Sequence, residues 1–390
     1  MKYNSCQSLL QSMVEFDTVN SAISGKPDVE LDLSLHLEAQ AGAMGLKAQR
    51  LPVSGAGFNL LVSHIVSDDA PWVLFESHLD TVSVEGMTVP PFEGVIENGR
   101  MYGRGTCDTK GTGAAMLWAL GNYRDGGTGG NNIGILYTLD EEVSKSGVRT
   151  FVKDQLPGLG WRPSGVVVGE PTLLALVGAH NGVVRWRIVT EGVAAHSSDP
   201  SKGRSAISMM SRVIDAIESQ YVPSLSAEHS LTGKAQCSIN IIRGGVQINI
   251  IPERCEIHLD RRVVPGESTE EVLPLVEQVL EGLRKEDPDL VVCQEAPDMV
   301  DFPLDPDMGK AFARVVQGAL GRLGLPDGVA GVGYGTDAST FGQAGIPAVV
   351  LGPGDIAQGH TADEWISLAQ LDRGVEVYQE IMGAKVGTAG

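Results

Sequence analysis

Five short segments, spread along the chain, carry acids and histidines that could bind metal ions together. They are Ser77-His78-Leu79-Asp80, Cys107-Asp108-Thr109, Asp140-Glu141-Glu142, Gly169-Glu170-Pro171 and Gly359-His360-Thr361. Nitrogen and oxygen ligands without cysteine suit zinc, cobalt or manganese. Three carboxylates and a bridging hydroxide would balance the charge of two divalent ions, and paired ions are a known hydrolytic arrangement. We therefore expect a two-metal site held by His78, Asp108, Glu142, Glu170 and His360.

Glu141 and Glu142 are the most informative pair of acids. Adjacent carboxylates repel each other, and at a partly buried position this repulsion raises the pKa of at least one of them. A metal ion bound to one carboxylate would relieve the repulsion, and the other could then act as a general base. The competing interpretation is a solvated acidic turn.

The remaining candidates also have plain structural interpretations. In His78-x-Asp80 the carboxylate could orient a metal-binding imidazole, or the pair could simply be hydrogen-bonded. Glu170 could be an acid at a turn before Pro171, and His360 could be a surface residue. Taken one at a time, these interpretations compete with metal binding, so the position of each residue in the fold matters.

Each candidate other than Asp108 follows a short apolar run that is typical of a buried strand. Residues 72–75 lead to His78 and Asp80, residues 133–137 to Glu141 and Glu142, residues 166–168 to Glu170, and residues 348–351 to His360. Continuous apolar strands indicate a mainly parallel sheet between helices. Ligands of such α/β sheets bind at the carboxyl ends of the strands, where all these side chains are expected.

The pattern changes in the middle of the chain. Strands are expected at residues 183–190, 236–243, 255–263 and 290–294, with helices at 205–221 and 268–286, the second opened by a capping box from Ser268 to Glu271. The order β-α-β-β-α-β is that of a ferredoxin-like unit. We therefore expect residues 1–179 and 295–390 to form a catalytic metal-binding domain, and residues 180–294 to form an inserted domain.

Bulk composition narrows the possible partners and the compartment. The chain has 390 residues, which favours two domains, and a net charge of −20, which argues against nucleic acid or an anionic membrane as partner. Its five cysteines are scattered without a CxxC spacing, as in a reducing compartment. Neither a signal peptide nor a membrane-spanning run is evident. These features predict a cytoplasmic protein.

Taken in order, the five segments resemble the dinuclear zinc deacylases and exopeptidases. This family includes acetylornithine deacetylase, succinyl-diaminopimelate desuccinylase, aminoacylase and glutamate carboxypeptidase. The resemblance extends from Ser77-His78-Leu79-Asp80 to His360-Thr361-Ala362-Asp363-Glu364. It implies that His78, Asp108 and Glu170 bind one zinc ion, and that Asp108, Glu142 and His360 bind the other.

The resemblance also implies roles for residues that bind no metal. Asp80 would orient His78, Glu141 would be the general base, and the peptide bond between Asp108 and Thr109 would be cis. The inserted domain would form a homodimer, and His196 would reach the active site of the partner subunit as an oxyanion donor. Asn249 and Arg262 match positions that bind the carboxylate of the substrate.

Within the family, three segments look most like acetylornithine deacetylase. They are Gly105-Thr106-Cys107-Asp108, His196-Ser197-Ser198-Asp199-Pro200 and Gly352-Pro353-Gly354-Asp355-Ile356-Ala357-Gln358. The expected substrate is therefore a small N-acyl amino acid, namely N-acetylornithine in arginine biosynthesis. The alternatives are a succinyl-diaminopimelate desuccinylase, a related carboxypeptidase or aminoacylase, and, more remotely, a non-catalytic relative that binds metal or peptide.

Overall fold

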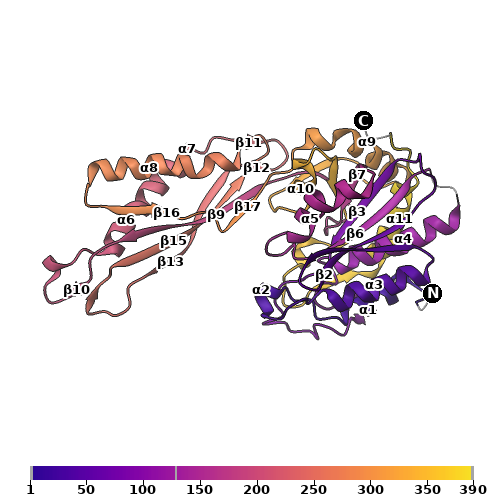
Figure 1. Cartoon of the computed structure of the whole chain (residues 1–390), viewed down its shortest axis with the longest axis horizontal. Helices are drawn as coiled ribbons and strands as arrows, with labels where there is room; N and C mark the ends of the chain where they lie inside the picture. Colours follow the sequence, from indigo (N-terminus) through magenta and orange to yellow (C-terminus); the bar gives the residue numbers. More distant parts are fainter. Residues whose placement is uncertain (1–2, 128–129, 388–390) are drawn as a thin grey trace. The chain divides into compact units, whose positions relative to one another are not determined.

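The computed structural model describes residues 3–127 and 130–387. The chain divides into two compact units, whose elements are labelled in Figure 1. The first unit contains the residues up to Gly178, Asp305–Ala330 and the residues from Thr336 onward, and the second contains Ala179–Leu304 and Gly331–Gly335. The expected inserted domain, residues 180–294, falls within the second unit, which continues to Leu304.

An eight-stranded sheet is the centre of the first unit. Its order is β1 (Lys47–Ser54), β2 (Gly57–His64), β6 (Asn132–Thr138), β3 (Trp72–His78), β7 (Pro163–Val168), β19 (Ala348–Val350), β8 (Leu176–His180) and β18 (Val329–Val332). The central strands β6, β3, β7 and β19 are parallel, whereas β2 and β8 pair with them in the antiparallel direction. The predicted mainly parallel sheet is confirmed.

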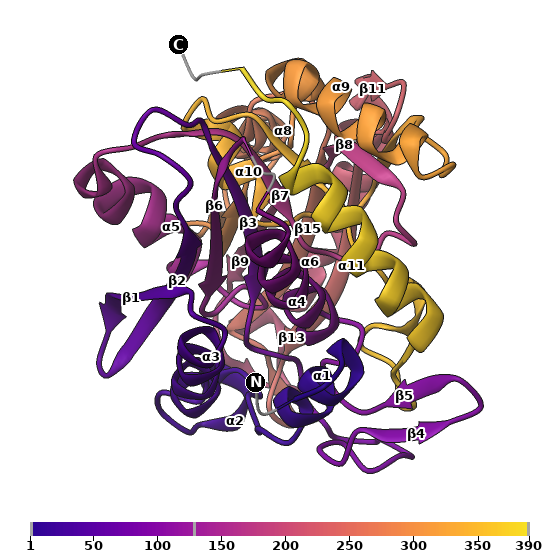
Figure 2. The same cartoon turned by 90° about the vertical axis from the view of Figure 1, so that its right-hand side faces the viewer.

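Helices from both ends of the chain cover this sheet. Figure 2 shows α4 and α11 in front of the sheet, with α1 below them. The helices of the unit include α1 (Cys6–Val14), α2 (Ser21–Ser24), α3 (Leu31–Ala43), α4 (Lys110–Gly126), α5 (Ser146–Thr150), α9 (Pro306–Arg322), α10 (Ala338–Gln343) and α11 (Leu368–Met382). A small sheet of β4 (Val95–Glu97), β5 (Arg100–Tyr102) and β20 (Trp365–Ser367) completes the unit.

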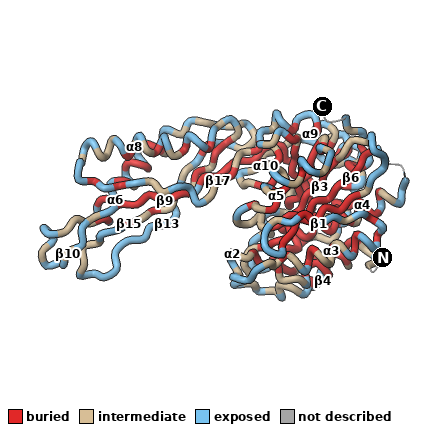
Figure 3. The backbone as a smooth tube through the Cα atoms, viewed as in Figure 1, coloured by how far each residue is buried: buried red, intermediate tan, exposed pale blue. Residues whose placement is uncertain are grey.

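The central strands are buried on both faces, as their apolar runs predict. Every described residue of β6 is buried, and in β3 only Trp72 is partly exposed. Figure 3 shows this as a concentration of buried backbone at β3 and β6. Burial of apolar area stabilises a fold by about 25 cal/mol per Å², so these strands are rigid supports for the residues that follow them.

The second unit has the ferredoxin-like order of elements. It contains β9 (Gly182–Glu191), α6 (Ala206–Ala216), β13 (Gln236–Gly244), β15 (Arg254–Val263), α8 (Val272–Glu286) and β16 (Val291–Gln294). The antiparallel sheet runs β13-β15-β9-β16, and β17 (Met299–Asp301) also pairs with β9. The α/β class with a second, ferredoxin-like part agrees with the prediction.

The start of the second helix in this unit differs from the predicted capping box. Ser268 accepts a hydrogen bond from the backbone of Glu270, and residues Thr269–Glu271 form a 3-10 turn before α8 begins at Val272. A 3-10 turn is tighter than an α-helical turn, so the serine oxygen meets an earlier amide than the capping box requires.

None of the helices in residues 3–127 and 130–387 combines the length and the apolar composition that a membrane crossing requires.

Candidate metal centre

Asp108 lies at the middle of the centre and presents one oxygen to each of two histidines. Its Oδ1 is 3.2 Å from His78 Nε2, and its Oδ2 is 3.2 Å from His360 Nε2. The residue is 6% exposed, and a cis peptide bond joins it to Thr109, the residue that caps the start of α4. The cis bond agrees with the resemblance. One carboxylate thus faces two sets of ligand-forming atoms.

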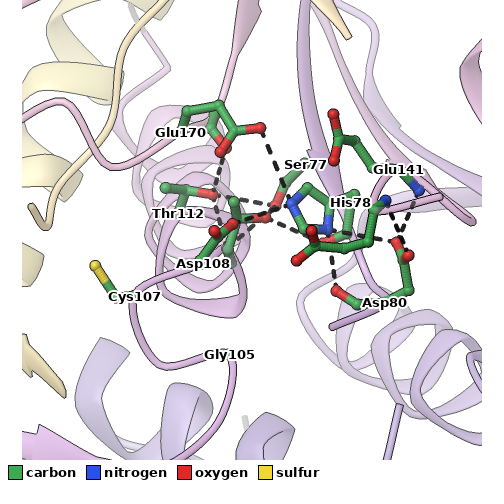
Figure 4. A network of polar contacts seen from close by, with 12 residues as sticks. Ser77, His78, Asp80, Gly105, Cys107, Asp108, Thr112, Glu141 and Glu170 are labelled. Carbon is green, nitrogen blue, oxygen red and sulfur yellow. Dashed lines mark hydrogen bonds and ion pairs between the residues drawn. The ribbon is translucent and has the colours of Figure 1, made fainter. Parts of the chain in front are cut away.

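The first set comprises His78, Asp108 and Glu170. One nitrogen or oxygen from each residue lies within 4.8 Å of the others, and all three residues are buried. His78 Nε2 is 3.9 Å from Glu170 Oε1, a contact shown in Figure 4. His78 ends β3 and Glu170 follows β7, so two adjacent parallel strands deliver the two side chains to Asp108.

The second set comprises Asp108, Glu142 and His360. Its ligand-forming atoms meet the same 4.8 Å limit, and His360 Nε2 is 3.1 Å from Glu142 Oε1. Glu142 follows β6, whereas His360 lies in a loop with a φ of 60°. A Cβ atom at the preceding Gly359 would lie 3.1 Å from Asp108 Oδ2, so glycine lets the loop approach the bridging carboxylate.

Asp80 connects His78 with the Glu141-Glu142 segment. His78 Nδ1 is 3.0 Å from the Asp80 carbonyl oxygen and 3.4 Å from Asp80 Oδ1. The Asp80 carboxylate also accepts hydrogen bonds from the backbone amides of Glu141, at 2.9 Å, and Glu142, at 3.2 Å. Burial favours the neutral acid, but these hydrogen bonds and the charge of His78 outweigh it and lower the pKa of Asp80.

The pKa values reflect a crowded set of acids around two imidazoles. Burial and the nearby Asp108 raise the pKa of Glu142 to about 7 and that of Glu170 well above its usual value. Hydrogen bonds to Asp108 and Glu142 raise the pKa of His360 to about 10. Burial opposes the charged form of His78, yet Asp108 and Asp80 raise its pKa as well. A centre that favours positive charge so strongly, with nitrogen and oxygen ligands only, fits two divalent cations.

Glu364 fixes the Asp108 loop and was not among the predicted site residues. Its Oε1 accepts the backbone amides of Cys107 and Asp108 at 2.9 and 3.0 Å, and its Oε2 accepts Gly105 N at 3.0 Å. Arg104 Nη1 donates to the same Oε2 at 2.7 Å, and neither side chain of this ion pair is more than 3% exposed. The segment His360-Thr361-Ala362-Asp363-Glu364 contained this acid, but only the folded chain shows which amides it binds.

Asn20 is a second residue that the sequence did not single out. Its side-chain amide donates to Asp80 Oδ2 at 2.7 Å and to Asp140 Oδ1 at 2.9 Å. No local pattern connects residue 20 with residues 80 and 140, because the contact exists only after the first segment folds beside β3. Asn20 therefore supports Asp80 through Oδ2, whereas the His78 ring lies nearest Oδ1.

The other predicted residues, His196, Asn249 and Arg262, belong to the second unit. β10 (Ala195–His196) pairs with β14 (Ile250–Ile251), and the Asn249 carbonyl accepts the amide of Ser197 at 3.0 Å. His196 and Asn249 are therefore neighbours. Arg262, on β15, donates to both oxygens of Asp260, at 2.7 and 3.4 Å, and its side chain is 33% exposed.

Known proteins resemble the chain over most of its length. Residues 74–384 match the model of peptidase family M20/M25/M40. The acetylornithine deacetylase of Proteus mirabilis (strain HI4320) is 30% identical over 375 residues, which cover 93% of this chain and 91% of that protein.

Solved structures share the fold. The M20 family metallo-carboxypeptidase Sso-CP2 of Sulfolobus solfataricus aligns with a TM-score of 0.78 at 17% identity, covering 98% of this chain and 99% of that one. The YXEP protein of Bacillus subtilis, a dinuclear metal binding peptidase from the M20 family, aligns with a TM-score of 0.71 at 15% identity, covering 97% of both chains. Together with the family match, these findings show that the chain belongs to peptidase family M20/M25/M40 and is a hydrolase of that family.

Proposed function

We propose that the protein hydrolyses the amide bond of an N-acyl amino acid, with N-acetylornithine as the substrate and arginine biosynthesis as the pathway. The observation that carries the proposal is Asp108, whose two oxygens face separate ligand sets while Glu141 lies beside Glu142. The similarity to an acetylornithine deacetylase at 30% identity supports the substrate.

Two zinc ions are the proposed cofactors, with cobalt or manganese as alternatives. His78, Asp108 and Glu170 would hold one ion, and Asp108, Glu142 and His360 the other. When bound, such ions lower the pKa of water and polarise a carbonyl oxygen. The chain itself supplies the geometry, because Asp80 holds His78 by its Nδ1 and leaves Nε2 directed at Asp108.

Glu141 is the proposed general base. It takes the proton of the attacking water on a carboxylate oxygen and then delivers it to the nitrogen of the leaving amine. Glu141 is suited to this because it is not in either ligand set, while its backbone amide is fixed by Asp80. Each proton it receives is passed on, so the carboxylate is regenerated at the end of the reaction.

His196 is the proposed donor to the oxyanion. Its Nδ1 accepts the backbone N–H of Ser198 at 3.1 Å, so the neutral ring carries its proton on Nε2, where it can be donated. Arg262 and Asn249 are proposed to bind the substrate carboxylate, for which a guanidinium is well shaped. Substrate binding would then share Arg262 with Asp260, its partner in the structure.

A homodimer through the second unit is also proposed. β13 ends the order of its sheet, and the apolar side chains of Ile242, Val246 and Ile248 on it and the following loop are exposed. An open strand edge with exposed apolar residues is a ready surface for a second copy.

If His196 acts in the partner subunit, mixing His196→Ala with Glu141→Gln should restore activity by subunit exchange. Verified exchange without recovery would exclude a shared site.

A cytoplasmic location is proposed from the cysteines. All five are free thiols, as a reducing compartment would keep them.

A hydrolysis screen of metal-reconstituted protein tests the function. The panel contains N-acetylornithine, N-succinyl-diaminopimelate, other N-acyl amino acids, dipeptides and a phosphate ester. We expect preferential hydrolysis of N-acetylornithine, and Glu141→Gln should keep both metal ions and lose at least about a hundredfold in kcat. Preference for the succinyl substrate or for dipeptides would select another member of the family. Full metal occupancy without hydrolysis of any amide would refute the enzymatic proposal.

A further inference from the structure

Lys145 is a buried lysine in the turn that follows the Glu141-Glu142 pair. Its side chain is only 3% exposed, and its Nζ is 3.2 Å from Glu141 Oε1. Lysine is almost never fully buried unless it is paired, since removal of an ammonium from water is costly. This ion pair involves the proposed general base, which belongs to neither ligand set, so the burial of Lys145 requires an explanation.

The turn itself is closed in a way that fixes where Lys145 begins. Asp140 has a φ of 61°, and its carbonyl oxygen accepts the backbone amide of Lys145 at 2.6 Å. The Asp140 carboxylate accepts the hydroxyls of Ser144 and Ser146, the latter at 2.7 Å. Lys145 has a φ of 57°, which directs the chain into α5. The backbone on both sides of the ion pair is therefore held independently of it.

Two further buried acids lie within the electrostatic reach of Lys145. Glu76 and Asp337 are each 1% exposed, and Thr138 links them by donating to Glu76 Oε1 at 2.6 Å and lying 3.5 Å from Asp337 Oδ2. Burial raises the pKa of both acids, and the positive charges of His78 and Lys145 act against this rise. Lys145 is therefore one of the positive charges near Glu141, Glu76 and Asp337.

We propose that Lys145 is a positioning residue that holds the Glu141 carboxylate in a single orientation for proton transfer. This inference rests on the proposed function, in which Glu141 moves the proton. The physical reason is the contrast with Glu142, whose carboxylate is fixed by His360, at 3.1 Å. Glu141 has no such ligand role, so another partner must restrict its side-chain torsions, and Lys145 is the charged group that contacts it.

Replacement of Lys145 by Met tests the proposal, because Met has a similar length and no charge. We expect kcat for N-acetylornithine to fall by about tenfold to a hundredfold, as for a misplaced catalytic group, with KM and metal content nearly unchanged. Lys145→Arg should retain most of the activity, and ethylammonium should partly restore Lys145→Ala. The matched control is Lys26→Met, which removes an exposed ion pair to Asp17 and should leave kcat unchanged.

Two measurements separate failure of this inference from failure of the proposed function. Lys145→Met should cause no additional loss in the Glu141→Gln background, whereas independent losses would show that Lys145 does not act through Glu141. A crystal structure of Lys145→Met should show Glu141 displaced or in several conformers, and this readout does not depend on any substrate. A single unchanged Glu141 conformer, or unchanged kcat with Glu141→Gln inactive, would overturn the role of Lys145 alone. If the Met variant does not fold, Lys145→Gln gives the same readouts.

Discussion

The two halves of the candidate centre share Asp108 but are built differently. In the half formed by His78 and Glu170, both side chains are at most 7% exposed. His78 ends β3 and Glu170 follows the adjacent strand β7. In the half formed by Glu142 and His360, the imidazole is 52% exposed and comes from a loop that begins after β19. The buried half is thus fixed by the sheet, and the exposed half depends on a loop closing over Asp108.

The half fixed by the sheet is therefore the more rigid one, and the half that contains the loop is the more accessible to solvent. Loops open with lower free energy than core strands, so a ligand carried by a loop can leave more readily. We infer that the buried half holds its cation more tightly, and that exchange of ions with solvent proceeds through the half that contains His360.

The largest contrast is expected between His78→Ala and His360→Ala. Loss of His78 leaves Asp80, Asp108 and Glu170 buried without the imidazole that they contact. Removal of one member of a buried ion pair lowers the free energy of unfolding by about 3–5 kcal/mol. Loss of His360 removes a half-exposed side chain, so the fold should be nearly as stable as before. Metal content and thermal unfolding of both variants, with and without chelator, measure the contrast.

The outcome that would contradict the comparison is simple. If both variants lose the same amount of metal and their melting temperatures fall by the same amount, burial does not distinguish the halves. If His360→Ala is the less stable protein, the loop rather than the sheet organises the centre.

The placement of four candidate ligands after neighbouring strands of the sheet could be predicted from the sequence. The apolar runs before His78, Glu142, Glu170 and His360 become β3, β6, β7 and β19, which are neighbours in the sheet order. The rule that ligands bind at the carboxyl ends of parallel strands therefore predicts that these side chains lie at one edge of the sheet. Asp108 follows no apolar run of this kind, and its expected place between the metals relied on its loop and on the resemblance.

The support around the ligands could not be predicted in this way. Glu364 binds backbone amides more than 250 positions away, and Asn20 binds Asp80 across 60 positions. Such contacts leave no periodic or spaced pattern, because any acid or amide that folds into place can make them. Lys145 is close in sequence to Glu141, but an i, i+4 pair normally indicates a solvated helix face rather than a buried turn.

Metal binding should depend on pH in both halves. A ligand must be deprotonated to bind a metal ion. In the exposed half, the pKa values are about 7 for Glu142 and about 10 for His360. An ion that binds to this half must therefore displace about two protons below pH 7, about one between pH 7 and 10, and none above pH 10. The metal affinity rises with pH, and the slope of its logarithm against pH decreases near pH 7.

In the buried half, protons also compete with the ion. The pKa values of both His78 and Glu170 are raised well above their usual values, so the metal affinity of this half should also rise with pH. Calorimetric titration with zinc in buffers of different ionisation enthalpy counts the released protons. Binding to either half without release of protons between about pH 6 and pH 9 would contradict the expectation.

The smallest effects are expected from residues that contact the candidate ligands without belonging to either ligand set. Asp80 should affect mainly one half of the centre, and Glu364 should affect both halves. Asp80 contacts the imidazole of His78, whereas it contacts Glu142 only through the backbone amide. Asp80→Asn should therefore weaken mainly the buried half, by about ten- to a hundredfold in metal affinity, the usual effect of an outer partner. Glu364 holds the backbone of Asp108 itself, which serves both halves. Glu364→Gln should therefore weaken both ions by similar factors, because the amide nitrogen of Gln cannot accept from Arg104 and the Asp108 loop loses an anchor. Competition with a chromogenic chelator resolves two affinities, and a Glu364→Gln variant that weakens only one ion would show that Asp108 does not bridge them.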